Sequence, residues 1–185
     1  MDRSACRNRG FTLIELLMGL AILAVLAALA APAYGNLIGR TRSQTARSEL
    51  DVAMNQARLG AVSRGAHAIA CPSGDGQNCS RTTQWHHGWL VFADLDHDGA
   101  HSADEPVLSV ARAQAAGVAI LSTRGRTRVD YQPDGSAGGT NLTLTICDRA
   151  TGATRASTLV INQSGRIRRG TPTPEGAAAC MRAAG

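Results

Sequence analysis

Five acidic residues fall within a span of twelve residues near the middle of the chain: Asp94, Asp96, Asp98, Asp104 and Glu105. The spacing of Asp94, Asp96, Asp98 and Glu105, with a glycine at position 99, matches the consensus pattern of a calcium-binding loop. In that pattern oxygen ligands stand at positions 1, 3, 5 and 12. No helical pattern flanks the cluster, so an EF-hand is not expected. The alternative interpretation is a polar hairpin loop in which Asp and Gly serve the turn geometry.

Arginine is the only basic residue type besides histidine, and two arginine-rich segments lie in the last third of the chain. In the first, Arg124, Arg126 and Arg128 alternate, so on an extended strand they would share one face. In the second, Arg166 and Arg168 repeat that spacing and Arg169 extends it. Guanidinium groups bind phosphate bidentately, and like charges on one face are unfavourable without a neutralising partner. Polyanion binding is one interpretation, and a solvated positive face or pairing with the acidic cluster is the other.

Residue patterns for catalysis are lacking in this sequence. It contains no Gly-x-Ser-x-Gly motif, no Cys/His nucleophile pattern and no phosphate loop, and the absence of lysine argues against Schiff-base chemistry. The acidic cluster lacks the aromatic and basic surroundings of a glycan cleft. We therefore expect no enzymatic activity and no cofactor, with calcium at Asp94, Asp96, Asp98 and Glu105 as the one alternative.

The five cysteines predict disulfide bonds more readily than a metal site. Cys6 lies in the basic N-terminal segment, which leaves an even number in the remainder of the chain. Three connectivities are possible for these four, and we expect Cys71–Cys79, which closes a Gly-rich loop, and Cys147–Cys180, which ties the tail to a strand. A zinc site would require closer spacing.

A long apolar segment near the N-terminus predicts a membrane-spanning helix. Between Phe11 and Gly39 the only charged residue is Glu15. The apolar stretch exceeds the about 20 residues that cross a bilayer as a helix, and the basic residues before it favour a cytoplasmic amino end. A carboxylate inside a membrane is costly, so Glu15 requires a partner.

The residues around Glu15 read Gly10-Phe11-Thr12-Leu13-Ile14-Glu15, after a short basic leader and before the apolar helix. In this motif the sequence resembles the type IV pilin and type II secretion pseudopilin superfamily. The resemblance implies that a prepilin peptidase cuts after Gly10 and N-methylates Phe11. It also implies that Glu15 neutralises the amino terminus of a neighbouring subunit during filament assembly.

The pattern of the remaining chain predicts an α+β fold, with a long N-terminal helix packed on an antiparallel sheet. An apolar stripe that includes Ala46, Leu50 and Ala57 extends the helix to about Ser63. Eight strands are expected after it, at Ala66–Cys71, Gly88–Ala93, Pro106–Ala111, Gly117–Ser122, Thr127–Gln132, Thr140–Cys147, Ala156–Asn162 and Gly165–Arg168. The predicted divisions are a leader (1–10), a membrane or filament-core half-helix (11–35), an amphipathic half-helix (36–64), a β-rich head (65–170) and a tail (171–185). We expect the tail to be loosely ordered except where Cys180 ties it.

Over nearly the whole chain the sequence is similar to FimT/GspH-type minor pilins. The stretches that carry the similarity are Gly88–Asp94, Asp134–Gly135 with Asn141–Cys147, and Leu159–Arg168. Minor pilins also carry a Trp-x-Val-Phe-x-Asp segment before such an acidic loop, without a metal being implied. The resemblance places the chain in the inner membrane with a periplasmic head, and then in a pilus at the cell surface among other major and minor pilins.

Some FimT-type members bind DNA in natural transformation through a Gly-Arg-x-Arg motif, which Gly165-Arg166-Ile167-Arg168 matches by position and type. The implied function is that of a minor type IV pilin that binds DNA without sequence specificity during uptake. Arg169 extends this motif, and we add Arg124, Arg126 and Arg128 on charge alone. The alternative is a GspH-like minor pseudopilin of a type II secretion system, a structural or initiator subunit without DNA binding.

Overall fold

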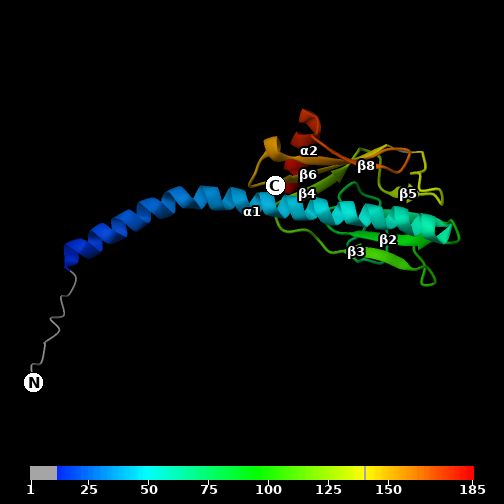
Figure 1. The fold of residues 1–185 in the computed structure, drawn as a ribbon, viewed down its shortest axis with the longest axis horizontal. Coiled ribbons are helices and arrows are strands. Elements are labelled where there is room, and N and C mark those ends of the chain that lie inside the picture. The colour runs from blue at the N-terminus through cyan, green and yellow to red at the C-terminus, as the bar shows by residue number, and fades with distance from the viewer. Residues whose placement is uncertain (1–11, 140) are drawn as a thin grey trace, which may run out of the picture. The chain divides into compact units, whose positions relative to one another are not determined.

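The computed structural model describes residues 12–139 and 141–185, with the backbone alone at residues 30–33 (Figure 1). The expected processing residues Gly10 and Phe11 lie outside the described residues. The chain forms two compact units, residues 1–37 and residues 38–185.

The first unit contains the beginning of helix α1 (Leu13–Arg64), which a reciprocal cap stabilises. The Thr12 hydroxyl accepts a hydrogen bond from the Glu15 backbone N–H at 3.3 Å, and the Glu15 carboxylate accepts one from the Thr12 backbone N–H at 2.8 Å. This is the capping box that a Thr-x-x-Glu sequence forms at a helix start. Beyond it the large apolar side chains from Leu13 to Leu29 are each more than half exposed. This part of α1 is long and apolar enough to cross a membrane, as expected.

The second unit is built around the remainder of α1. The apolar stripe predicted from the sequence is confirmed, because its residues are at most 1% exposed: Ala46, Leu50, Ala53, Met54, Ala57 and Ala61. They belong to one hydrophobic core that also includes inward-facing residues of both sheets, such as Val91 and Leu144. Figure 1 shows this half of the helix running along the sheets.

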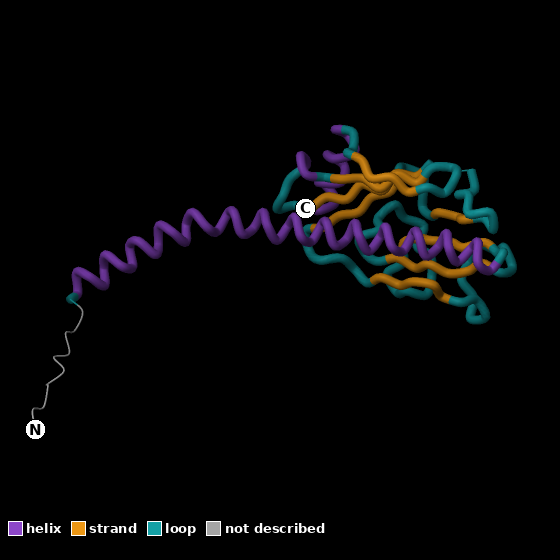
Figure 2. The backbone as a smooth tube through the Cα atoms, in the orientation of Figure 1, coloured by secondary structure: helices purple, strands orange, loops and turns teal. Residues whose placement is uncertain are grey.

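All eight predicted strands are present, and every pairing between them is antiparallel. They are β1 (His67–Pro72), β2 (Trp89–Asp94), β3 (Val107–Ala111), β4 (Val118–Ser122), β5 (Val129–Tyr131), β6 (Leu142–Asp148), β7 (Ser157–Ile161) and β8 (Ile167–Gly170). The predicted α+β class is confirmed, as Figure 2 shows.

The sequence pattern did not specify how the strands are divided, and the described strands form two antiparallel sheets of four. Their orders are β3-β2-β1-β5 and β4-β6-β7-β8. Eight strands side by side would measure roughly 38 Å across, whereas a helix with its side chains is about 10–12 Å wide. One helix cannot cover a sheet of that width, but two narrower sheets can share a core with it.

The tail also differs from the expectation, since it forms helix α2 (Pro174–Ala184). The Thr173 hydroxyl caps this helix by accepting a hydrogen bond from the Gly176 backbone N–H, and Pro174 occupies the first turn. The apolar side of α2 packs on the second sheet, where Ala177 and Cys180 join Ala119 and Cys147 in a small buried cluster. The alanine run after Thr-Pro-Glu is the sequence signal for this helix.

Both expected disulfide bonds are present in the structure. Cys147–Cys180 joins β6 to α2 and closes a sequence separation of 33 residues. Cys71–Cys79 joins the end of β1 to the loop that follows it and closes a separation of 8 residues. Within that shorter loop, hydrogen bonds from Asn78, Gln77 and Ser73 hold the pKa of the Asp75 carboxyl well below its usual range.

Candidate nucleic-acid interface

The arginines of the Gly-Arg-x-Arg motif lie on and beside β8, the last strand of the second sheet. Gly165 has a positive φ of 72°, and a Cβ atom there would lie 2.0 Å from the Gly135 carbonyl oxygen. Only glycine fits this turn, because other residues disfavour the backbone conformation and would collide with the neighbouring loop. Ile167 packs against the core, so Arg166 and Arg168 on either side of it are exposed.

Arg168 begins a row of residues that crosses the second sheet. It pairs in register with Val160 on β7, which pairs with Thr143 on β6. Thr143 in turn donates its backbone N–H to the hydroxyl of Thr123 at 3.0 Å, just after the end of β4. Directly paired residues point to the same face of a sheet, and the buried Leu144 beside Thr143 points to the other. The row therefore lies on the outer face and spans roughly 14 Å, three strand spacings.

A groove of about 590 Å³ lies over this outer face. Its lining includes Arg124 and Val160, and the start of α2 contributes Gly176 and Ala179. The hydroxyl-bearing lining residues are Thr83, Ser122, Thr123, Thr143, Thr145, Thr158, Thr171 and Thr173. Hydroxyl groups and guanidinium groups are both donors that contact the phosphates of a nucleic acid.

The other predicted arginine group is not arranged as the sequence suggested. Residues 124 and 125 form a turn, in which the Arg126 backbone N–H donates to the Thr123 carbonyl at 2.9 Å and Gly125 has a φ of 79°. Arg124, Arg126 and Arg128 are all exposed, but they do not share the face of one strand because glycine reverses the chain between them. Arg124 lines the groove over the second sheet.

Two of the predicted arginines make contacts within the protein. Arg128 donates from Nη1 to the Gly99 carbonyl at 3.1 Å, so its charge lies beside the acidic cluster. Arg169 forms an ion pair of 2.8 Å with Asp51 on α1. By contrast, the guanidinium groups of Arg166 and Arg168 form no hydrogen bond or ion pair with the described part of the chain.

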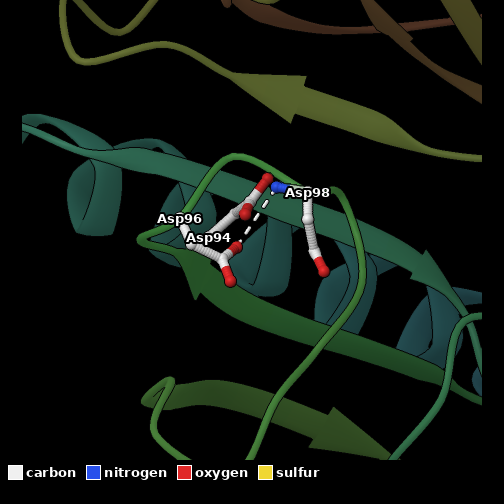
Figure 3. Close-up of side chains that lie close together, drawn as sticks. All are labelled: Asp94, Asp96 and Asp98. Atoms are coloured by element: carbon white, nitrogen blue, oxygen red, sulfur yellow. Dashed lines mark hydrogen bonds between the residues drawn. The ribbon is translucent and has the colours of Figure 1, made fainter.

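The acidic cluster forms the loop after β2, and the structure brings together three of its carboxylates (Figure 3). One carboxylate oxygen from each of Asp94, Asp96 and Asp98 lies within 4.8 Å of the others. Glu105 is not part of this set. Its carboxylate accepts hydrogen bonds from the backbone N–H groups of Leu95 at 2.7 Å and Ser102 at 3.0 Å, which hold the loop closed.

Asp94 is the electrostatically unusual member of the acidic cluster. The residue is 3% exposed, and its Oδ1 atom has no hydrogen-bond partner among the described residues, while Oδ2 accepts from the Gly99 backbone N–H at 3.2 Å. Burial, followed by the nearby charge of Glu105, raises the pKa of the Asp94 carboxyl. The charged form of this side chain is therefore poorly compensated in the folded protein.

The threonine-lined groove and the role of α2 in forming it were missed at the level of sequence. The signal was present in the alternation of Leu142-Thr143-Leu144-Thr145, which places threonine on one face of β6 and leucine on the other. What the alternation does not reveal is which strands lie beside β6. The capping role of Glu15 was also missed, although Thr12 three residues before it is the usual sign of a capping box.

Comparison with known proteins agrees with this fold. A family model described as "Type II transport protein GspH" matches residues 46–165, and one described as "Prokaryotic N-terminal methylation motif" matches residues 6–31. No curated protein matches the chain.

Two solved structures share the fold at low sequence identity. The type IV minor pilin FimU of Pseudomonas aeruginosa is 24% identical, with a TM-score of 0.57, over 72% of this chain and 90% of that one. The minor pseudopilin EpsH of the type 2 secretion system of Vibrio cholerae is 10% identical, with a TM-score of 0.51, over 71% of this chain and 98% of that one.

Proposed function

The chain belongs to the GspH family of minor pilins and pseudopilins, and from this premise we propose that it is a minor type IV pilin that binds DNA during natural transformation. Type IV pili and type II secretion systems both contain subunits of this fold. The choice between the two systems rests on the surface of the head, because the stalk motif is common to both.

The N-terminal segment supports processing and membrane anchoring. The N-terminal methylation motif spans residues 6–31 and includes Gly10, Phe11 and Glu15. We assign cleavage after Gly10 and methylation of Phe11 to a prepilin peptidase, and pairing with the amino terminus of a neighbouring subunit to Glu15. Before assembly the apolar half of α1 holds the subunit in the inner membrane with its head in the periplasm. Afterwards the subunit lies in the pilus with other major and minor pilins.

The observation that carries the DNA proposal is the in-register row from Arg168 through Val160 and Thr143 to Thr123, with Arg124 beside it. It places two guanidinium groups and several hydroxyls on one outer face of the second sheet. Arg166 adds a third exposed positive charge at the edge of that face. These groups are suited to phosphate and sugar contacts, which position a protein on DNA without reading its sequence.

The salt dependence of binding tests this assignment. For the unit 38–185 and duplex DNA we expect the logarithm of the binding constant to fall linearly with the logarithm of salt concentration, by about 0.9 per phosphate neutralised. Substituting Arg166→Ala together with Arg168→Ala should weaken binding equally for unrelated DNA sequences. The slope should also decrease by roughly 2, because two phosphate contacts are lost. Fluorescence anisotropy with labelled duplexes measures both quantities.

The matched control is Arg64→Ala with Arg81→Ala, which changes net charge by the same amount at exposed positions that do not line the groove. This variant should retain nearly all of the affinity. If both double variants weaken binding to the same extent, net charge and not the outer face governs the interaction. Unchanged affinity in the Arg166/Arg168 variant would remove those residues from the site.

A second candidate function is that of a minor pseudopilin which initiates a short periplasmic filament and has no nucleic-acid partner. The description of the matching family and the shared fold of EpsH favour it. Transformation frequency, piliation and export of secreted proteins in a deletion strain separate the two functions. The DNA proposal predicts loss of transformation in the Arg166/Arg168 variant with normal piliation, whereas the pseudopilin function predicts a secretion defect and no effect of that variant.

A further inference from the structure

A small arginine-lined pocket lies on a different part of the head from the groove over the second sheet. It has a volume of about 350 Å³ and is formed between α1 and the segment that leads into β7, which includes the short 3-10 helix η1 (Ala153–Arg155). The lining residues with charged or hydroxyl side chains are Arg40, Ser43, Arg47, Thr154, Arg155 and Ser157. No acidic side chain is among the lining residues.

Two segments far apart in the sequence bring the three arginines of this pocket together. Arg40 and Arg47 are seven residues apart, two helical turns, and so lie on the same side of α1. Arg155 ends η1, and the loop before η1 packs closely on α1 at Gly39. A Cβ atom at Gly39 would lie 2.6 Å from Asp148 Oδ1 and 2.9 Å from Thr151 Cγ2. The glycine thus permits the contact that places Arg155 opposite Arg40 and Arg47.

The positive charges in the pocket are not compensated by the described residues around them. The Nε atom of Arg47 is buried and has no hydrogen-bond partner among the described residues. The described ion pairs, His67–Asp130 and Asp51–Arg169, involve none of the three arginines. Asp148 ends β6 next to this loop, but it is 2% exposed beside Gly39 and does not line the pocket. A buried donor without an acceptor, among like charges, favours an anionic ligand.

We propose that this pocket binds a phosphate group. Arginine binds phosphate through paired N–H donors, and the hydroxyls of Thr154 and Ser157 supply further donors at the rim. The same chemistry is presented by the headgroup of an anionic phospholipid and by free inorganic phosphate. Arg40 follows Gly35, the end of the expected membrane segment, by five residues, and even a fully extended chain of that length reaches only about 18 Å. The pocket is therefore within reach of the lipid headgroups before the subunit enters a filament.

The test uses the full chain in two preparations, with thermal unfolding of the head followed through its two buried tryptophans, Trp85 and Trp89. In detergent, inorganic phosphate at about a hundred times its Kd should raise Tm by roughly 5–10 °C. In nanodiscs, phosphatidylglycerol should raise Tm relative to phosphatidylcholine if the source is lipid. Added phosphate should then reduce that difference by competition. Stabilisation by free phosphate with equal Tm in both lipids identifies free phosphate as the ligand.

The variants Arg155→Gln and Arg47→Gln should lose both stabilising effects, and Arg64→Gln on the same helix should keep them. Arg155 is exposed, so its substitution does not disturb the core. The proposal is overturned if neither phosphate nor phosphatidylglycerol changes Tm in the wild type, or if Arg64→Gln loses the effect as Arg155→Gln does. It is also overturned if Arg155→Gln reduces DNA affinity as strongly as the Arg166/Arg168 variant, because the pocket would then belong to the nucleic-acid interface.

Discussion

Two carboxylates show how the same chemical group serves different ends in this protein. Glu15 caps the first turn of α1 through Thr12, yet it also lies at the start of a segment where a charge requires a partner. Asp94 lies in the head, where burial leaves one of its oxygens without a hydrogen bond. In both cases the charge and the hydrogen-bonding capacity of the side chain can be separated by replacing the acid with its amide.

For Glu15 the informative change is to glutamine. Glu15→Gln retains an oxygen that can accept from the Thr12 N–H but removes the charge, whereas Glu15→Ala removes both. We expect both variants to insert into the membrane with a normally folded head, and both to be absent from sheared pili, as measured by immunoblot of membrane and pilus fractions. Normal incorporation of Glu15→Gln alongside exclusion of Glu15→Ala would show that the helix cap, and not the charge, is what assembly requires.

For Asp94 the change to asparagine should stabilise the head at neutral pH. Because the pKa of the Asp94 carboxyl is raised, the folded state binds the proton more readily than the unfolded chain does. The stabilisation that the protonated Asp94 side chain gives to the folded state is therefore fully present below about pH 4. It is lost as the pH rises through the pKa of the folded state. Asp94→Asn should raise Tm at pH 7, and the gain should vanish at low pH, where the wild-type carboxyl is protonated.

The control for that measurement is the exposed Asp104, whose change to asparagine should leave Tm at pH 7 nearly unaltered. Calcium binding at this loop would reverse the expected effect of Asp94→Asn. A rise in Tm with millimolar CaCl₂ that Asp94→Asn and Asp98→Asn both abolish would establish the loop as a calcium site, and Asp94→Asn would then destabilise the calcium-loaded head.

At the scale of elements, α2 is attached to the second sheet and helps to form the groove on that sheet. The helix contributes one side of the threonine-lined groove, and a small apolar cluster and one disulfide bond hold it against β4 and β6. Its packing surface consists mostly of alanines, which bury little area each. The covalent bond therefore carries much of the attachment.

Removing the Cys147–Cys180 bond by a double substitution to serine should lower the free energy of unfolding by about 2–4 kcal/mol. It should also increase hydrogen exchange in α2 and weaken DNA binding at the groove. Removing Cys71–Cys79 is the matched control. That bond spans 8 residues against 33, so its loss should cost less and leave α2 protected. If the amides of α2 remain protected without Cys147–Cys180, non-covalent packing alone holds the helix.

For the whole molecule, local patterns predicted the elements well but not their assembly. The stripe through Leu50 and Met54 and the alternation along β6 identify a helix and a strand because each depends on neighbours in the sequence. Which strands pair is set by contacts between distant segments, so the division into two sheets was not foreseen. The turn at Gly125 separated arginines that a continuous strand would have aligned.

The pocket of Arg40, Arg47 and Arg155 shows the same limit. Its two halves are more than a hundred residues apart, and no local pattern links them. By contrast, the Gly-Arg-x-Arg segment could be located from sequence because its glycine is required by the turn itself. Sites built on one turn are recognisable in the sequence, whereas sites built between segments emerge only from the fold.

β8 is the edge strand of its sheet, and this position affects how copies of the protein associate with one another. Another chain can pair with an exposed edge strand through backbone hydrogen bonds, and charged side chains on that strand oppose such pairing. Arg168 and Arg169 lie on this edge strand, so their charges should oppose edge-to-edge pairing between two copies of the head. Neutralising them should lower colloidal solubility, which light scattering would reveal before any change in ligand affinity is interpreted.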